Sequence, residues 1–184
     1  MMRRSKTPTT PIMTPAEERF MAFEGLVQWT QSVASQSTRV SAAAAALSDS
    51  ISKAPDIRRR ALLALQTECH FFAIAAHKLI EFLDWSRELQ LCDGMDLAEI
   101  DSFDKDDICD LRNMREHVTQ YFKGNGHFKP RWAKGTPQFS ADASSIVGNL
   151  IGGRLDWVKF GGAATRLLDQ LNKLPIPYSN PPHQ

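Results

Sequence analysis

The chain has 184 residues, 42% of them hydrophobic, and its 22 lysine and arginine residues against 21 aspartate and glutamate residues give a formal net charge of +1. This balance excludes an intrinsically disordered chain and a strongly basic nucleic-acid module. No apolar run approaches the roughly 20 residues of a membrane span, and the basic N-terminus lacks the apolar part of a secretory signal. Three widely spaced cysteines form neither a disulfide framework nor a zinc pattern. We therefore expect a cytoplasmic protein with reduced thiols and no membrane contact.

The charges are segregated along the chain. Residues 93–110 carry eight acidic side chains and one lysine, whereas residues 112–173 carry ten basic and four acidic side chains. A nearly neutral protein with this pattern can still present a basic surface. The composition therefore leaves open a surface that contacts RNA, and equally an acidic or basic surface that binds a protein partner.

The N-terminal part of the chain predicts helices. Residues 1–14 have the composition of a disordered basic tail, and residues 14–17 (Thr-Pro-Ala-Glu) form a helix start signal. Apolar residues recur at helical spacing over residues 15–35, and the alanine-rich stretch 40–47 has high helix propensity. The polar residues at 35–38 leave open whether this part is one helix or two.

The next helix is predicted over residues 55–91. Pro55 fits its first turn, and the sequence Cys-Asp-Gly at 92–94 ends it. Its apolar residues cover a wide arc of the helical wheel, as in a central core helix. The opposite, polar stripe consists of Gln66, His70, His77, Glu81, Asp84 and Glu88.

The remaining elements complete a single domain. A short helical turn is expected at residues 96–99, and a helix over 104–123 begins with aspartates, which the helix dipole favours. Residues 124–140 have no periodicity and read as a loop. Gly152-Gly153 lies between two apolar runs and predicts a β-hairpin whose second strand includes Leu155 and Trp157.

A final helix is predicted at residues 162–174, and residues 175–184 form a proline-rich tail. The sequence therefore predicts one domain over residues 15–174. Its expected fold is mainly α, a four- to five-helix bundle with a small C-terminal β-hairpin.

The predicted helix at 104–123 contains the sequence Arg112-Asn113-Met114-Arg115-Glu116-His117. Arg112, Asn113, Glu116 and His117 fall on the face opposite the apolar stripe, with Arg112 and His117 about 140° apart. Arg115 lies at the edge of the stripe, which suits a bridging side chain. Cleavage of RNA by its own 2′-hydroxyl needs a base whose pKa is near neutral, which His117 would supply. It also needs a cation that stabilises the negative charge on the phosphate, which Arg112 would supply. In a dimer, two such faces could form one composite cleft.

The sequence Arg-Asn-x3-His on a helix of an all-α bundle resembles the HEPN superfamily. The resemblance implies a bundle that is commonly a homodimer and acts as a metal-independent RNase of defence or toxin–antitoxin systems, or binds RNA without catalysis. It implies Arg112 and His117 as the catalytic pair, Asn113 as the accompanying polar residue, and no cofactor. It also implies an acidic or polar residue from another helix, for which we choose Glu81. The resemblance covers residues 15–123.

Two other interpretations remain open. The polar face of the motif helix is also typical of a helix surface that only contacts water. The protein would then be a non-enzymatic helical bundle that binds a protein partner. Alternatively, His70, His77 and Glu81 are spaced to bind a metal ion, for which Asp110 or His117 would have to supply a further ligand.

The segment after the motif interleaves cations with aromatic rings. The residues predicted to bind RNA are Lys123, Lys129, Arg131, Trp132 and Lys134. Lysine and arginine contact phosphates, and aromatic rings stack on bases. The same composition suits a loop that its aromatic residues hold against the core.

Overall fold

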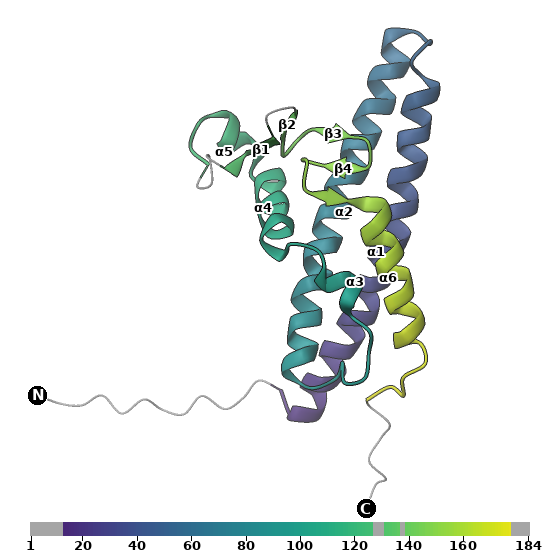
Figure 1. Cartoon of the computed structure of the whole chain (residues 1–184), viewed down its shortest axis with the longest axis vertical. Coiled ribbons are helices and arrows are strands. Elements are labelled where there is room, and N and C mark those ends of the chain that lie inside the picture. Colours follow the sequence, from purple (N-terminus) through teal and green to yellow (C-terminus); the bar gives the residue numbers. More distant parts are fainter. Residues whose placement is uncertain (1–12, 127–130, 137–138, 178–184) are drawn as a thin grey trace, which may run out of the picture.

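Two long helices joined by a tight turn span the length of the molecule (Figure 1). The computed structural model describes residues 13–126, 131–136 and 139–177. Helix α1 (Pro15–Asp49) runs along the whole molecule, and helix α2 (Pro55–Glu88) returns beside it. The upper end of this pair extends beyond the other elements in the view of Figure 1.

Helix α1 is continuous through residues 35–38, so this part is one helix. Its start is the predicted one, because the Thr14 hydroxyl accepts a hydrogen bond from the Glu17 N–H (3.3 Å) and the Glu17 carboxylate accepts one from the Thr14 N–H (2.8 Å). The Ser37 hydroxyl donates to the carbonyl of Trp157 (2.9 Å). The polar residues at 35–38 thus include a contact to a distant helix and do not mark a break.

Helix α2 is the central core helix that its apolar arc predicts. Phe72 and Leu83 on this helix are fully buried. The helix ends at Glu88, before the predicted residue 91, because Gln90 takes a left-handed conformation (φ 57°). Hydrogen bonds from the N–H groups of residues 90 and 91 back to the last turn close this end.

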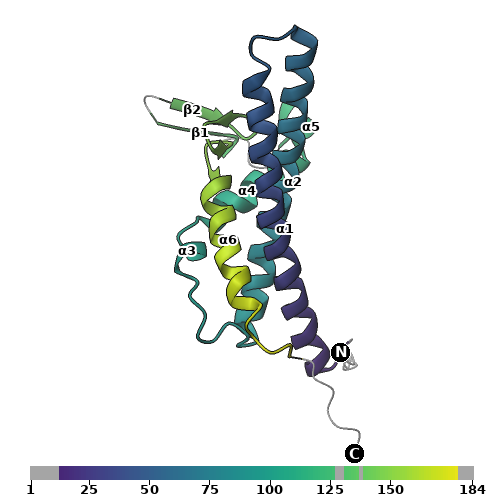
Figure 2. The same cartoon turned by 90° about the vertical axis from the view of Figure 1, so that its right-hand side faces the viewer.

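Helix α6 (Trp157–Leu171) packs along α1 (Figure 2). Phe160 of α6 is fully buried, and its ring meets Phe72 of α2 and Phe103 edge to face, with centroids 6.3 and 4.8 Å apart. Such pairs add to the stabilisation that burial of the rings provides. This aromatic cluster ties α6 to the helical pair. The short helix α3 (Ala98–Asp101) contacts α6.

Helix α6 begins earlier than the predicted residue 162. The Asp156 carboxylate accepts hydrogen bonds from the N–H groups of Val158 and Lys159, both at 3.0 Å, and so caps the helix. Trp157 is therefore the first residue of a helix, and its predicted place in a strand is wrong.

The predicted helix at 104–123 is divided into α4 (Lys105–Glu116) and α5 (Val118–Phe122). Asp104 caps α4 by accepting hydrogen bonds from two N–H groups, which confirms the expected start. His117 lies between the two helices with non-helical dihedral angles (φ −106°, ψ 27°). A continuous helix is thus wrong here. The β-branched residues that follow His117 weaken helix propensity, and contacts of α5 with the β region favour its new direction.

Two small antiparallel sheets follow α5 in the chain. Strands β1 (Ala133–Thr136) and β2 (Phe139–Asp142) pair with Ala133 opposite Asp142, so β1 and the start of β2 occupy part of the predicted loop at residues 124–140, which is wrong there. Strands β3 (Ile146–Val147), β4 (Leu150–Ile151) and β5 (Leu155–Asp156) form the second sheet.

The β4–β5 turn is the predicted hairpin turn. Gly152 and Gly153 both have positive φ angles (59° and 66°), a conformation that glycine adopts without a steric penalty. The fold class is therefore confirmed: the chain is a mainly helical bundle with a small set of antiparallel strands near its C-terminus.

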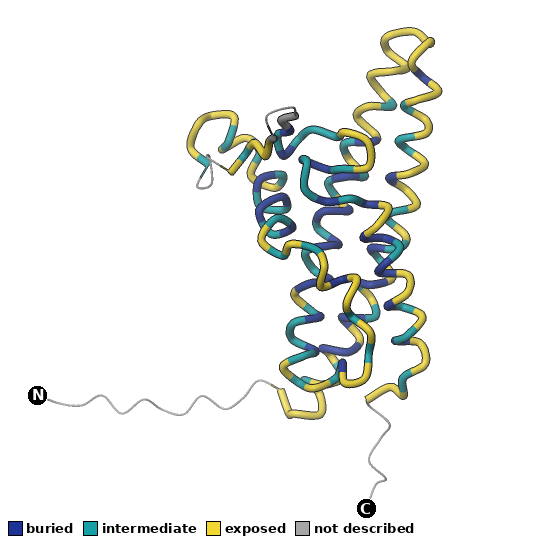
Figure 3. Tube along the Cα trace, viewed as in Figure 1, coloured by how far each residue is buried: buried dark blue, intermediate teal, exposed yellow. Residues whose placement is uncertain are grey.

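Burial is uneven along the molecule (Figure 3). The core lies where α4, α6 and the sheets meet the helical pair, whereas the far end of the α1–α2 pair is mostly exposed. Within the described residues, no helix combines the length and apolar character that crossing a membrane would require. The expected tails, residues 1–14 and 175–184, lie largely outside the described residues.

Candidate functional site

The motif residues of α4 form a connected polar cluster. The Arg112 guanidinium makes an ion pair with Glu116 (Nη2–Oε2, 2.8 Å) and donates a hydrogen bond to Asn113 (Nη1–Oδ1, 2.8 Å). The Asn113 amide in turn lies 3.5 Å from the Cys109 sulfur. Arg112 and Glu116 are each 28% exposed. The guanidinium is thus held in one orientation while part of it still faces solvent.

Helix α2 places His77 close to this cluster. Its Nδ1 atom is buried, has no hydrogen-bond partner among the described residues, and lies 3.8 Å from a carboxylate oxygen of Glu81. Burial lowers the pKa of His77 below its ordinary value of 6.5, Glu81 opposes this change, and the positive charge of Arg112 adds to it. Burial and the charge of Arg112 thus favour the neutral form of His77, although carboxylates lie nearby.

The structure does not pair the predicted catalytic residues within one chain. The predicted angle between Arg112 and His117 holds only for a continuous helix, but His117 follows the end of α4 and is exposed. In the described part of the chain, no hydrogen bond or ion pair joins the side chains of Arg112 and His117. Glu81, the chosen acidic residue, lies beside His77 and binds Lys78 (2.6 Å), and among the described residues no hydrogen bond or ion pair joins it to Arg112.

Arg115 has the bridging role that its position on the wheel predicts. Its guanidinium donates to the backbone carbonyls of Ala143 (3.0 Å) and Gln66 (2.9 Å) and so joins α4 to α2 and to the sheet region. Burial lowers the pKa of Arg115. Burial also lowers the pKa of His70, and the positive charge of Arg115 adds to this effect.

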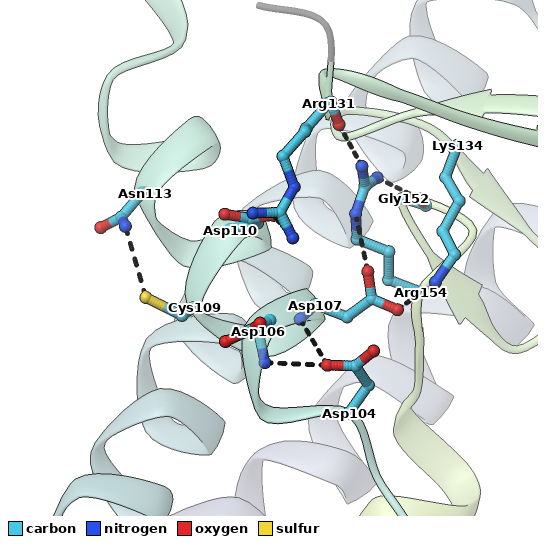
Figure 4. Close-up of polar contacts among 10 residues, drawn as sticks. All are labelled: Asp104, Asp106, Asp107, Cys109, Asp110, Asn113, Arg131, Lys134, Gly152 and Arg154. Carbon is cyan, nitrogen blue, oxygen red and sulfur yellow. Dashed lines mark hydrogen bonds and ion pairs between the residues drawn. The ribbon is translucent and has the colours of Figure 1, made fainter. Parts of the chain in front are cut away.

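Acidic residues of α4 bind the predicted RNA-binding segment (Figure 4). Arg131 forms an ion pair with Asp110 (2.7 Å), and Lys134 forms one with Asp107. Arg154, which the sequence analysis missed, lies 3.5 Å from Asp107 and is only 3% exposed. Three cations of the basic block thus pair with two acids of the acidic block, whereas the side chains of Arg131 and Lys134 remain about half exposed.

Burial has the largest effect on the pKa of Asp110, the buried acid of this network. Burial raises the pKa of Asp110, although Arg131 and Arg154 act in the opposite direction. Arg154 is further held by the carbonyls of Gly152 (2.8 Å) and Arg131. The segregation of charge along the sequence indicates that the two blocks can pair, but it does not identify which residues pair.

The other predicted RNA-binding residues have three different outcomes. Trp132 stacks on Tyr121 with ring centroids 5.0 Å apart and meets Phe122 edge to face. This contact matches the alternative interpretation, in which aromatic residues hold the segment against the rest of the fold. Lys123 is exposed at the end of α5. Lys129 lies outside the described residues.

The residues of the metal interpretation do not form a metal site. Within residues 13–126, 131–136 and 139–177, no three His, Cys, Asp or Glu side chains are grouped so that they could hold a metal ion. His77 and Glu81 are adjacent, but no third ligand joins them. Comparisons with protein-family models, with curated proteins and with solved structures found no match.

Proposed function

We propose that the protein binds single-stranded RNA and cleaves it without a metal ion, as a HEPN-like homodimer. The observation that carries this proposal is the Arg112 guanidinium, which Asn113 and Glu116 orient while part of it stays exposed. An oriented, partly exposed arginine is suited to bind a phosphate and to stabilise the extra charge of a transition state.

The reaction needs one base and one cation at the scissile phosphate. The 2′-oxygen attacks phosphorus while His117 takes the 2′-hydroxyl proton, and the bond to the 5′-oxygen breaks as that oxygen accepts a proton from solvent. The products are a 2′,3′-cyclic phosphate and a 5′-hydroxyl. Arg112 stabilises the negative charge on the phosphoryl oxygens during this step.

The side chains of Arg112 and His117 make no direct polar contact within the described part of one chain, and this is compatible with a site shared between two chains. In a two-fold dimer, the same surface of each copy meets the other, so Arg112 of one protomer can face His117 of its partner. The half-exposed cluster on α4 and the exposed His117 lie on this proposed surface. Two equivalent composite sites would result.

The test is incubation of the purified protein with mixed-sequence single-stranded RNA in EDTA. We expect cleavage to 2′,3′-cyclic phosphate ends, and a loss of at least about 100-fold in the rate for Arg112→Ala and for His117→Ala. Arg39→Ala changes an exposed arginine of α1 and is the matched control. Wild-type protein that neither retains RNA at low salt nor cleaves it would overturn the proposal.

A mixing experiment tests the shared site directly. The two inactive variants, Arg112→Ala and His117→Ala, are mixed under conditions that let subunits exchange. Roughly a quarter of wild-type activity should return, because half of the dimers are then mixed and each mixed dimer has one intact site. If no activity returns although exchange is demonstrated, both residues act from the same chain.

The alternative is a non-enzymatic bundle that binds a protein partner. One observation favours it: a groove of about 500 Å³ between the exposed end of the α1–α2 pair and β3, with apolar side chains that include Leu47, Ile51 and Leu62. Ile51 and Leu62 in this groove are 66% and 41% exposed, and exposed apolar patches are typical of protein interaction sites. Failure of the RNA assays would favour this alternative.

A further inference from the structure

A second, smaller pocket lies directly beyond the motif. It has a volume of about 260 Å³ and opens between α2, the α4–α5 junction and the segment before β1. The residues that line it are Gln66, His70, Arg115, Val118, Phe122, Trp132 and Ser144. Val118 directly follows His117, so the pocket adjoins the proposed site of cleavage.

One side of this pocket is aromatic. The Trp132 ring is fixed by its stacking on Tyr121, and Phe122 meets it edge to face with centroids 5.7 Å apart. Phe122 is nevertheless 72% exposed, the largest exposed fraction among the large apolar side chains of the described residues. A phenylalanine that leaves most of its ring in water at a pocket offers a surface on which another planar ring can stack.

The other side of the pocket is polar and carries a positive charge. Arg115 is held by two backbone carbonyls, and among the described residues no carboxylate lies within ion-pair distance of it. The Ser144 hydroxyl donates to Asp142 (2.6 Å), so its oxygen can still accept a hydrogen bond, and Gln66 adds an amide. Polar groups facing an aromatic surface can recognise the edge of a flat polar ring.

We propose that this pocket binds one base of the RNA, stacked on Phe122 with its polar edge toward Gln66 and Ser144. Its volume is below the range of about 300–1,000 Å³ that is typical of pockets for drug-sized ligands, which suits one ring system. Proteins that select unpaired RNA commonly stack splayed bases on aromatic side chains. This inference rests on the proposed function and adds a position where the base beside the cleaved phosphate is held.

The test compares two oligomers with the same number of phosphates, a single-stranded RNA and its abasic counterpart. Phe122→Ala should weaken binding of the RNA by at least about fivefold, because it removes a stacked base. It should leave binding of the abasic oligomer unchanged. Phe71→Ala is the matched control, since Phe71 is also an exposed phenylalanine (53%) but does not line the pocket. Both side chains are largely in water, so we expect both variants to fold.

The outcomes separate this inference from the proposed function. An equal loss for both oligomers, or no loss for either, would overturn the pocket as a base site while RNA binding itself stands. If the wild type binds neither oligomer, the proposed function fails. Titration with uridine and adenosine monophosphates, followed by the NMR signal of the Trp132 indole, then tests the pocket alone. A shift that Phe122→Ala abolishes supports it, and an unchanged signal overturns it.

Discussion

Replacing Asp107 by asparagine should test whether the acidic residues of α4 hold the β region in place. Asp107 binds Lys134 and lies 3.5 Å from the buried guanidinium of Arg154. Asparagine keeps the shape of the side chain but removes the charge. Asp106→Asn is the matched control, because Asp106 lies in the same first turn of α4 and is exposed. Both variants lose the same interaction with the helix dipole.

The expected cost follows from the burial of the two partners. Breaking a buried ion pair by removing one partner typically costs about 3–5 kcal/mol, because the other charge is left without compensation. Arg154 is only 3% exposed but keeps two carbonyl acceptors, and Asp110 remains near it. We therefore expect Asp107→Asn to lose about 2 kcal/mol more than Asp106→Asn.

Urea unfolding and thermal unfolding of both variants measure this difference. For a chain of this size, about 2 kcal/mol corresponds to a difference in Tm of roughly 4–8 °C. Asp107→Asn should also change the tryptophan fluorescence, because the segment that carries Trp132 loses its ion pair between Lys134 and Asp107 and the stacking of Trp132 weakens. Equal unfolding free energies for the two variants would refute the reasoning, since Arg154 would then not depend on Asp107.

Three further predictions concern packing and pH. Gly25→Ala should lower the unfolding free energy by about 1–3 kcal/mol, because the new Cβ would lie 2.0 Å from the Phe82 ring. Gly162→Ala has room for its Cβ and should raise the unfolding free energy by about 0.5–1 kcal/mol. Urea unfolding checks both changes. Phe160→Ala should cost about 3–5 kcal/mol in the same assay, and a loss below about 1 kcal/mol would contradict the central place of this ring. The pKa of His77 is lowered in the folded state. The contribution of neutral His77 to the free energy of unfolding is therefore complete above the ordinary pKa of 6.5, and it is lost as the pH falls through the pKa of the folded state. His77→Gln should therefore reduce the loss of stability between about pH 7.5 and about pH 5, and an unchanged loss would contradict this assignment.

Local signals in the sequence predicted local structure well. The capping residues Thr14 and Asp104 and the glycines of the β4–β5 turn act within a few residues of themselves, so their patterns can be read directly. The break at His117 was missed because it depends on contacts of α5 with a distant segment. Tertiary contacts of this kind override helix propensity.

The candidate site was only partly predictable for the same reason. Arg112 and Glu116 pair because residues four apart on a helix are neighbours, and Asn113 is next to Arg112 in the chain. The pairing of Arg131 with Asp110 requires knowledge of which surface the segment meets, and no spacing rule contains that information. The burial of Arg154 is the feature of the site that the sequence predicts least, because a lone arginine beside two glycines has the pattern of an ordinary surface residue.

The return of α6 to α1 has a consequence for how the chain folds during synthesis. The hydrogen bond from Ser37 to Trp157 closes a loop of 120 residues, and Phe72 gains Phe160 as a neighbour only after that loop closes. Contacts between such distant residues form late, because their loop-closure entropy must be paid first. While the C-terminal part is still in the ribosome, the α1–α2 hairpin can form but its apolar side remains uncovered. The emerging chain should therefore bind chaperones that recognise exposed apolar surface until α6 is released.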